Sequence, residues 1–224
     1  MYESFLKPTI KYCEDNLPSY IVQPANAWSN LIFVFVGVYI FLNSLNHKNP
    51  LLKLFGPMAV LVGIFSFFYH SSFTFVGQFL DLGSMYLISS YLVILNLRRL
   101  NAQLFTTRKL FFIFLLLFSA SLSVTYFIRP TNNFSIGYPI FILQVLAIII
   151  LEWQLYKRNS NTYKIHNLLI AFTILMFAFI SLILDLLRIW CDTSTFHLIN
   201  GHALWHGLSS ISFLFVYFFY RQFD

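Results

Sequence analysis

The sequence predicts an all-α fold, a seven-helix transmembrane bundle with its N-terminus outside and its C-terminus in the cytoplasm. Of the 224 residues, 58% are apolar and only 10% are charged, and the mean hydropathy is +0.73. A soluble domain carries about 25% charged residues, so this chain lacks the charge to coat a water-facing surface. Its apolar stretches are also continuous, whereas a transmembrane β-barrel would show short alternating segments.

A membrane-spanning helix needs about 20 mostly apolar residues. Seven stretches reach that length, and their approximate bounds are 28–46, 51–70, 77–97, 109–128, 134–156, 164–189 and 202–220. We therefore expect a capping segment (1–27) on the non-cytoplasmic side, the transmembrane domain (28–220) and a short cytoplasmic tail (221–224). The first segment is not a signal peptide, because it lacks a short apolar core after a basic start.

The distribution of Lys and Arg along the chain predicts its orientation in the membrane. With seven spans, four of the 14 basic residues fall on the N-terminal side and ten fall on the other side. The N-terminus is therefore expected outside. The net charge of +6 then reflects topology. No nucleic-acid partner is expected, because such a protein would carry a basic patch on a soluble domain.

A few polar residues interrupt the spans, and ionisable groups within a membrane are costly and usually functional. The predicted topology brings His70, Asp81, His202 and His206 to one level near the outer face. Helical periodicity groups them further. Ser66 and His70 are four residues apart and share a helix face, as do His202 and His206.

Two histidines one turn apart on a helix can bind one metal ion, and a third from another helix completes a three-ligand site. Three protein ligands plus water is the usual form of a catalytic zinc centre. Zinc lowers the pKa of that water to about 7 and polarises a carbonyl. Asp81 could accept a proton during attack by water, and Ser66 could donate a hydrogen bond to a developing oxyanion.

Structural roles can also account for single members of this set. A lone intramembrane histidine more often forms a helix–helix hydrogen bond, and an HxxxH pair alone is a weak motif. The convergence of three histidines and an acid at one depth favours a metal site. Asp185 and Arg188 are three residues apart, which is typical of a structural ion pair.

The two cysteines, Cys13 and Cys191, both fall on the predicted outer side. That compartment permits disulfides. A bridge between them would tie the N-terminal segment to the loop before the last helix, and two unrelated free thiols are the alternative.

These residues give the chain a resemblance to the alkaline ceramidase family, within a superfamily of seven-helix membrane hydrolases that includes adiponectin-type receptors. The matching stretches, in order, are Tyr12–Asn16, Trp28–Asn30, Ser66–His70, Gly77–Asp81 and His202–His206. The order and spacing agree along nearly the whole chain.

The resemblance implies a zinc ion held by His70, His202 and His206. It implies Asp81 as the proton acceptor for water and Ser66 as a transition-state stabiliser. Family members cleave the amide bond of ceramides to a sphingoid base and a fatty acid. The family also has a disulfide that looks like the Cys13–Cys191 pair.

The resemblance also implies a calcium site in the N-terminal segment, and here the chain departs from the family. Glu14 and Asn16 fit the pattern, and Tyr12 could supply a backbone carbonyl. However, Lys11 and Gln23 stand where the family has acids. Calcium usually needs several oxygen ligands with carboxylates among them. This argues against calcium, and we hypothesise that the Lys11 ammonium replaces it by pairing with Glu14, with Asp15 as a further candidate partner.

The sequence thus predicts a multi-pass, zinc-dependent intramembrane amidase that draws a ceramide-like lipid from the bilayer. Its active site is expected at the non-cytoplasmic face, which is the periplasmic face if the protein is bacterial. One alternative is hydrolysis of another lipid ester or amide. Another is a non-enzymatic seven-helix receptor with a structural metal.

Overall fold

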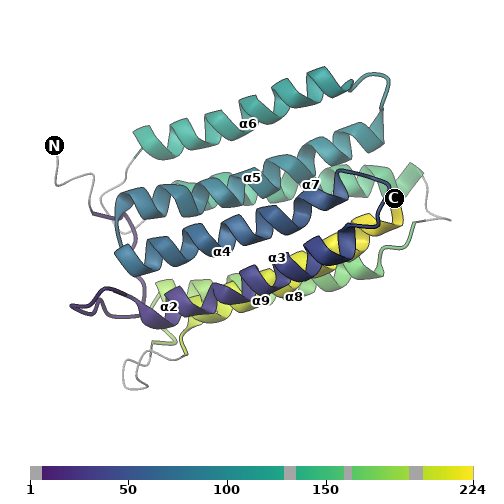
Figure 1. Cartoon of the computed structure of the whole chain (residues 1–224). Coiled ribbons are helices and arrows are strands. Elements are labelled where there is room, and N and C mark those ends of the chain that lie inside the picture. Colours follow the sequence, from purple (N-terminus) through teal and green to yellow (C-terminus); the bar gives the residue numbers. More distant parts are fainter. Residues whose placement is uncertain (1–6, 129–134, 159–162, 192–198, 224) are drawn as a thin grey trace. The chain divides into compact units, whose positions relative to one another are not determined.

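The computed structural model describes residues 7–128, 135–158, 163–191 and 199–223 (Figure 1). The described residues contain no strand, and seven helical segments are long and apolar enough to cross a membrane, so the predicted fold class is confirmed. These spans are Pro24–Ser44, Leu52–Ser72, Phe75–Leu100, Thr107–Phe127, Gly137–Arg158, His166–Leu186 and Gly201–Phe223. The predicted bounds agree within four residues. The orientation of the termini stays a prediction.

The helices, in chain order, are α2 (Pro24–Ser29), α3 (Leu31–Ser44), α4 (Phe55–Ser72), α5 (Phe75–Leu100), α6 (Thr107–Phe127), α7 (Gly137–Arg158), α8 (His166–Leu186) and α9 (Gly201–Tyr220). Two 3-10 turns, η1 (Leu52–Leu54) and η2 (Arg221–Phe223), adjoin α4 and α9. The chain forms two compact units, one of Met1–Asp81 with Lys164–Asp224 and one of Leu82–Tyr163.

In the first unit, α3 packs along α4, and α8 packs along α9 (Figure 1). The α3–α4 contact is close because glycines face each other across it. A Cβ on Gly56 would lie 2.7 Å from the Gly37 carbonyl oxygen, and one on Gly37 would lie 2.8 Å from the Gly56 carbonyl oxygen. Small residues at such crossings let helix backbones approach each other in a membrane.

The second unit contains α6, α7 and most of α5, and polar side chains join these helices. The Gln144 amide on α7 donates to the Ser121 hydroxyl on α6 (2.8 Å) and accepts a hydrogen bond from Ser89 on α5. Near the ends of α5 and α7, Arg99 pairs with Glu152 at 2.6 Å. These polar side chains thus hydrogen-bond to one another inside the unit, as groups removed from water in a lipid environment must.

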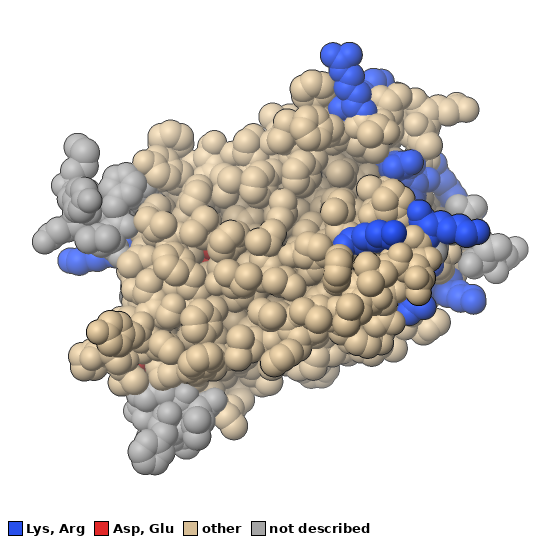
Figure 2. Space-filling model, viewed as in Figure 1, with Lys and Arg blue, Asp and Glu red and all other residues tan. Residues whose placement is uncertain are grey.

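Large apolar side chains lie exposed along the spans, including Phe112 and Leu116 on α6 and Leu143 on α7. Figure 2 shows a face formed almost wholly by uncharged residues. Lys and Arg instead lie at helix ends, as at the last turns of α5 and α7. This pattern suits helices whose middle portions face lipid.

Candidate metal centre

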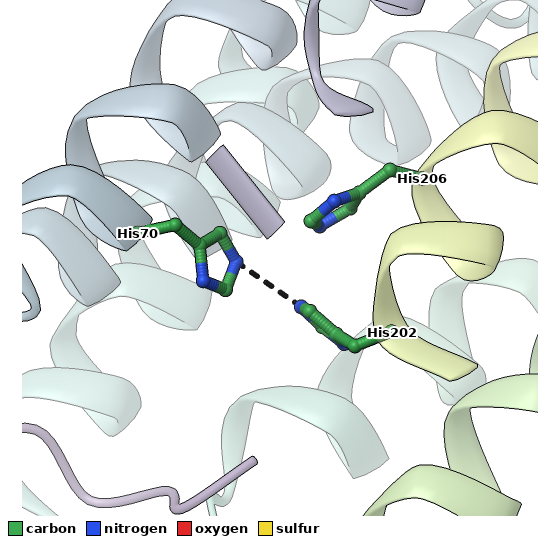
Figure 3. A group of neighbouring side chains, drawn as sticks. All are labelled: His70, His202 and His206. Carbon is green, nitrogen blue, oxygen red and sulfur yellow. Dashed lines mark hydrogen bonds between the residues drawn. The ribbon is translucent and has the colours of Figure 1, made fainter. Parts of the chain in front are cut away.

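The three predicted histidine ligands come together in the first unit (Figure 3). His70 lies in the last turn of α4, and His202 and His206 lie in the first two turns of α9. Helix α9 begins where it does because the Asn200 side chain accepts a hydrogen bond from the Ala203 N–H (2.7 Å). This N-cap fixes the helix start, and with it the helix face that carries both histidines.

One ring nitrogen from each histidine lies within 4.8 Å of the others, and all three residues are buried. The Nε2 atoms of His70 and His202 are 3.1 Å apart, as the dashed line in Figure 3 marks. Two nitrogens bound to one tetrahedral zinc at about 2.0–2.1 Å lie about 3.3 Å apart. The observed separation fits such a pair of ligands.

The outer ring nitrogens of two histidines have protein partners. The Nδ1 of His70 is 2.9 Å from the Gln23 side-chain oxygen, and the Nδ1 of His206 is 2.8 Å from the Ser29 hydroxyl. These contacts leave both Nε2 atoms directed to the centre, which is the usual arrangement around metal-binding histidines. By contrast, the buried Nδ1 of His202 has no hydrogen-bond partner in the described part of the chain.

The chemistry of the donor set therefore fits a metal of zinc type. The centre offers three buried imidazoles, and imidazole nitrogens suit zinc better than calcium or magnesium. The alternative is that His70 and His202 simply hydrogen-bond to each other through their Nε2 atoms. That contact would involve two of the three converging rings and would not explain the position of His206.

Asp81 and Ser66 lie beside this centre, as the sequence predicted for the two candidate catalytic residues. Ser66 sits one turn before His70 on α4 and is 2% exposed. Its hydroxyl lies 3.5 Å from the His206 Nε2 and hydrogen-bonds to the Asp81 carboxylate. Ser66 thus links the carboxylate on α5 to the histidines on α9.

The N-terminal segment covers the same site. The Tyr12 ring stacks on the His202 ring, with centroids 3.9 Å apart, and is 1% exposed. The next residue, Cys13, forms a disulfide with Cys191, with a Cα–Cα distance of 5.4 Å. The predicted bridge is confirmed, and it ties the segment to the chain just beyond α8.

Asp185 has a different role from the one predicted. Its two carboxylate oxygens accept hydrogen bonds from the Cys13 N–H (2.9 Å) and the His202 N–H (3.1 Å). Arg188 lies close enough for an electrostatic interaction with Asp185, but its guanidinium donates to the Tyr12 carbonyl (3.3 Å). Asp185 therefore interacts with Arg188 only electrostatically, while its two oxygens join the N-terminal segment to α9.

The residues of the expected calcium or lysine-substituted site also differ from the hypothesis. Glu14 is buried, and its carboxylate accepts hydrogen bonds from the Ala25 and Asn26 N–H groups (both 2.8 Å) at the start of α2. Lys11 is exposed, and the described residues show no ion pair between it and Glu14. In the described part of the chain, the Glu14 carboxylate therefore pairs with free N–H groups at the start of α2, which compete with a lysine for the same oxygens.

Three residues at the site have contacts that the sequence does not predict. Ser29 lies in a stretch that carried the resemblance, yet nothing in its spacing pointed to His206. Gln23 was considered only as a lost calcium ligand. The sequence shows Asp185 as an acid within a span, but its spacing from Arg188 predicts an ion pair and not the observed contacts with backbone N–H groups.

Comparison with known proteins adds an independent finding. A family model described as Ceramidase matches residues 6–224. The chain is 25% identical over 214 residues to alkaline ceramidase 1 of Homo sapiens, which covers 91% of this chain and 78% of that protein. It is 23% identical over 212 residues to alkaline ceramidase 1 of Mus musculus, over 91% of this chain and 76% of that protein.

Proposed function

Since the chain belongs to the Ceramidase family, we propose that it is a zinc-dependent intramembrane hydrolase, which cleaves the amide bond of ceramide-like lipids to a sphingoid base and a fatty acid. The observation that carries the zinc proposal is the convergence of three buried histidine nitrogens within 4.8 Å. The family and the similarity to two alkaline ceramidases support the substrate class and the reaction.

The metal ligands are His70, His202 and His206. Gln23 and Ser29 hold two of these rings in place through their Nδ1 atoms, and the Tyr12 ring packs against the third. A bound zinc ion would supply Lewis acidity, which makes water a better nucleophile and polarises the amide carbonyl.

Asp81 acts as the general base and then as the general acid. It takes a proton from the attacking water and passes it to the nitrogen of the leaving sphingoid base, because an amine leaves readily only when protonated. The Ser66 hydroxyl, which hydrogen-bonds to Asp81, keeps the carboxylate in one orientation.

Ser66 has a second role once Asp81 is protonated. A neutral carboxyl group can itself donate a hydrogen bond, so the Ser66 hydroxyl no longer has to donate its hydrogen bond to Asp81. The hydroxyl then turns to the carbonyl oxygen that gains negative charge. Such a donor acts most strongly where water is excluded, and Ser66 is buried.

The position of the site suits a lipid substrate. His70 ends α4 and His202 begins α9, so the ligands lie near one end of these helices. A ceramide-like molecule can place its amide at this level while its two hydrocarbon chains stay in the bilayer. The excess of basic residues at the other helix ends favours the non-cytoplasmic face for the site, which is the periplasmic face in a bacterium.

Metal analysis and ceramide hydrolysis on detergent-purified protein test this proposal together. We expect one zinc per chain and release of fatty acid in the wild type, and loss of both in His202→Ala. His166→Ala is the matched control, since His166 is exposed at the start of α8. Zinc binding without cleavage of any lipid would refute the proposed hydrolase activity and favour a receptor with a structural metal. Cleavage of another ester or amide alone would refute the ceramide assignment.

A further inference from the structure

The side-chain amide of Gln23 lies between the N-terminal segment and the metal centre. Gln23 is 1% exposed. Its side-chain oxygen contacts His70 Nδ1 (2.9 Å) and accepts a hydrogen bond from the Asn26 amide (3.3 Å). Its backbone N–H also donates to the His70 carbonyl (3.0 Å). Gln23 therefore holds His70 from both its backbone and its side chain.

The nitrogen of the same amide faces two oxygens of the N-terminal segment. Gln23 Nε2 donates to the Glu14 carbonyl (3.3 Å) and to the Asn16 side-chain oxygen (2.9 Å). A glutamine side chain has two N–H donors and one oxygen with two lone pairs. All of these are used here, so the amide is fully satisfied in its buried position.

These contacts leave little for a cation to bind. Calcium takes six to eight oxygen ligands and is usually held by carboxylates. The Glu14 carboxylate is already hydrogen-bonded to the start of α2. The Gln23 amide nitrogen donates to both the Glu14 carbonyl and the Asn16 side-chain oxygen. The partial positive charge of its N–H groups would repel a cation at that point.

We infer that the Gln23 amide takes the structural place of a calcium ion in this chain and joins the N-terminal segment to His70 without any divalent cation. The inference rests on the proposed function in treating His70 as a metal ligand. It assigns Gln23, and not Lys11, as the group that replaces the ion. Gln23 is thus a positioning residue that acts through His70, and the enzyme works in the absence of calcium.

A carboxylate in place of the Gln23 amide should make the protein bind and respond to calcium. In Gln23→Glu, an oxygen would replace the nitrogen that faces the Glu14 carbonyl and the Asn16 oxygen. Three oxygens would then face one another, and a cation would relieve their repulsion. Adding Lys11→Asp introduces a second new carboxylate beside that of Gln23→Glu and removes a positive charge, so the double variant should bind calcium more tightly than the single variant.

Calcium titration calorimetry and thermal unfolding on calcium-depleted, zinc-loaded protein test the inference without needing turnover. The wild type should show no calcium isotherm and no change in Tm up to millimolar calcium. Gln23→Glu should unfold at a lower temperature, and calcium should restore its Tm. The double variant should bind in the roughly 10⁻⁴–10⁻³ M range of extracellular modules or tighter.

Gln103→Glu is the matched control, because Gln103 is exposed and the same chemical change there should give no calcium response. Tight binding of calcium by the wild type would overturn the inference. So would folded, zinc-loaded Gln23→Glu and Lys11→Asp/Gln23→Glu variants whose Tm does not respond to calcium. Failure of ceramide hydrolysis would instead contradict the proposed function and would leave the calcium titrations interpretable.

Discussion

Removing the Asp185 carboxylate should loosen the N-terminal segment and the start of α9 at the same time. Asp185 is 0% exposed, and each of its two oxygens accepts one backbone N–H, from Cys13 and from His202. His202 lies in the first turn of α9, where N–H groups have no partner within the helix. The acid from α8 therefore serves as an N-terminal cap for the helix that carries two metal ligands.

The size of the effect follows from these two hydrogen bonds. A buried donor left without a partner costs about 1–3 kcal/mol, so Asp185→Ala should lower the free energy of unfolding by about 2–6 kcal/mol if both N–H groups stay buried. Asp185→Asn keeps one acceptor oxygen and turns an NH₂ group towards the second N–H. We expect about half the loss for this variant.

Reversible unfolding in mixed micelles measures these differences, and zinc content after dialysis reports on His202. Asp15→Asn is the matched control, because Asp15 is an exposed acid in the same N-terminal segment. The reasoning fails if Asp185→Ala unfolds like the wild type. It also fails if Arg188→Ala costs more than Asp185→Ala, since that order would indicate that an ion pair dominates.

Three further changes test neighbouring features. Gly201→Ala would place a Cβ 2.4 Å from the Ser181 carbonyl oxygen, so the α8–α9 contact should open at a cost of about 1–3 kcal/mol, measured by unfolding, with weaker zinc retention. Ser66→Ala should lower kcat by about 10²–10³ while zinc content, measured by elemental analysis, stays unchanged. Cys13→Ser with Cys191→Ser should lower stability by about 2–5 kcal/mol, and a reducing agent should then have no further effect on Tm.

The spans and the histidine cluster could be predicted from the sequence because both follow from simple geometry. Bilayer thickness fixes the length of an apolar helix, and the helical period places His202 and His206 on one face. Alternation of helix direction then brings His70 to the same level. None of these steps requires knowledge of a side-chain rotamer or a hydrogen-bond partner.

The contacts around the cluster could not be predicted in the same way, because they depend on which donors lack a partner in the folded chain. Charge pairing suggested Lys11 with Glu14 and Arg188 with Asp185. In the structure, each acid accepts backbone N–H groups instead. A carboxylate within a low-dielectric interior favours fixed N–H donors beside it, whereas a lysine at the surface keeps its ammonium in water.

The metal ligands lie at the ends of helices, and this position couples helix capping to metal binding. Asp185 accepts the His202 N–H at the start of α9, and Gln23, directly before α2, contacts both the backbone and the ring of His70 at the end of α4. The groups that satisfy free backbone donors and acceptors thus also set the ligand positions. Substitutions at Asp185 and Gln23 should therefore alter zinc affinity although neither residue is a ligand. Residues that hydrogen-bond to metal ligands have this effect at other metal sites.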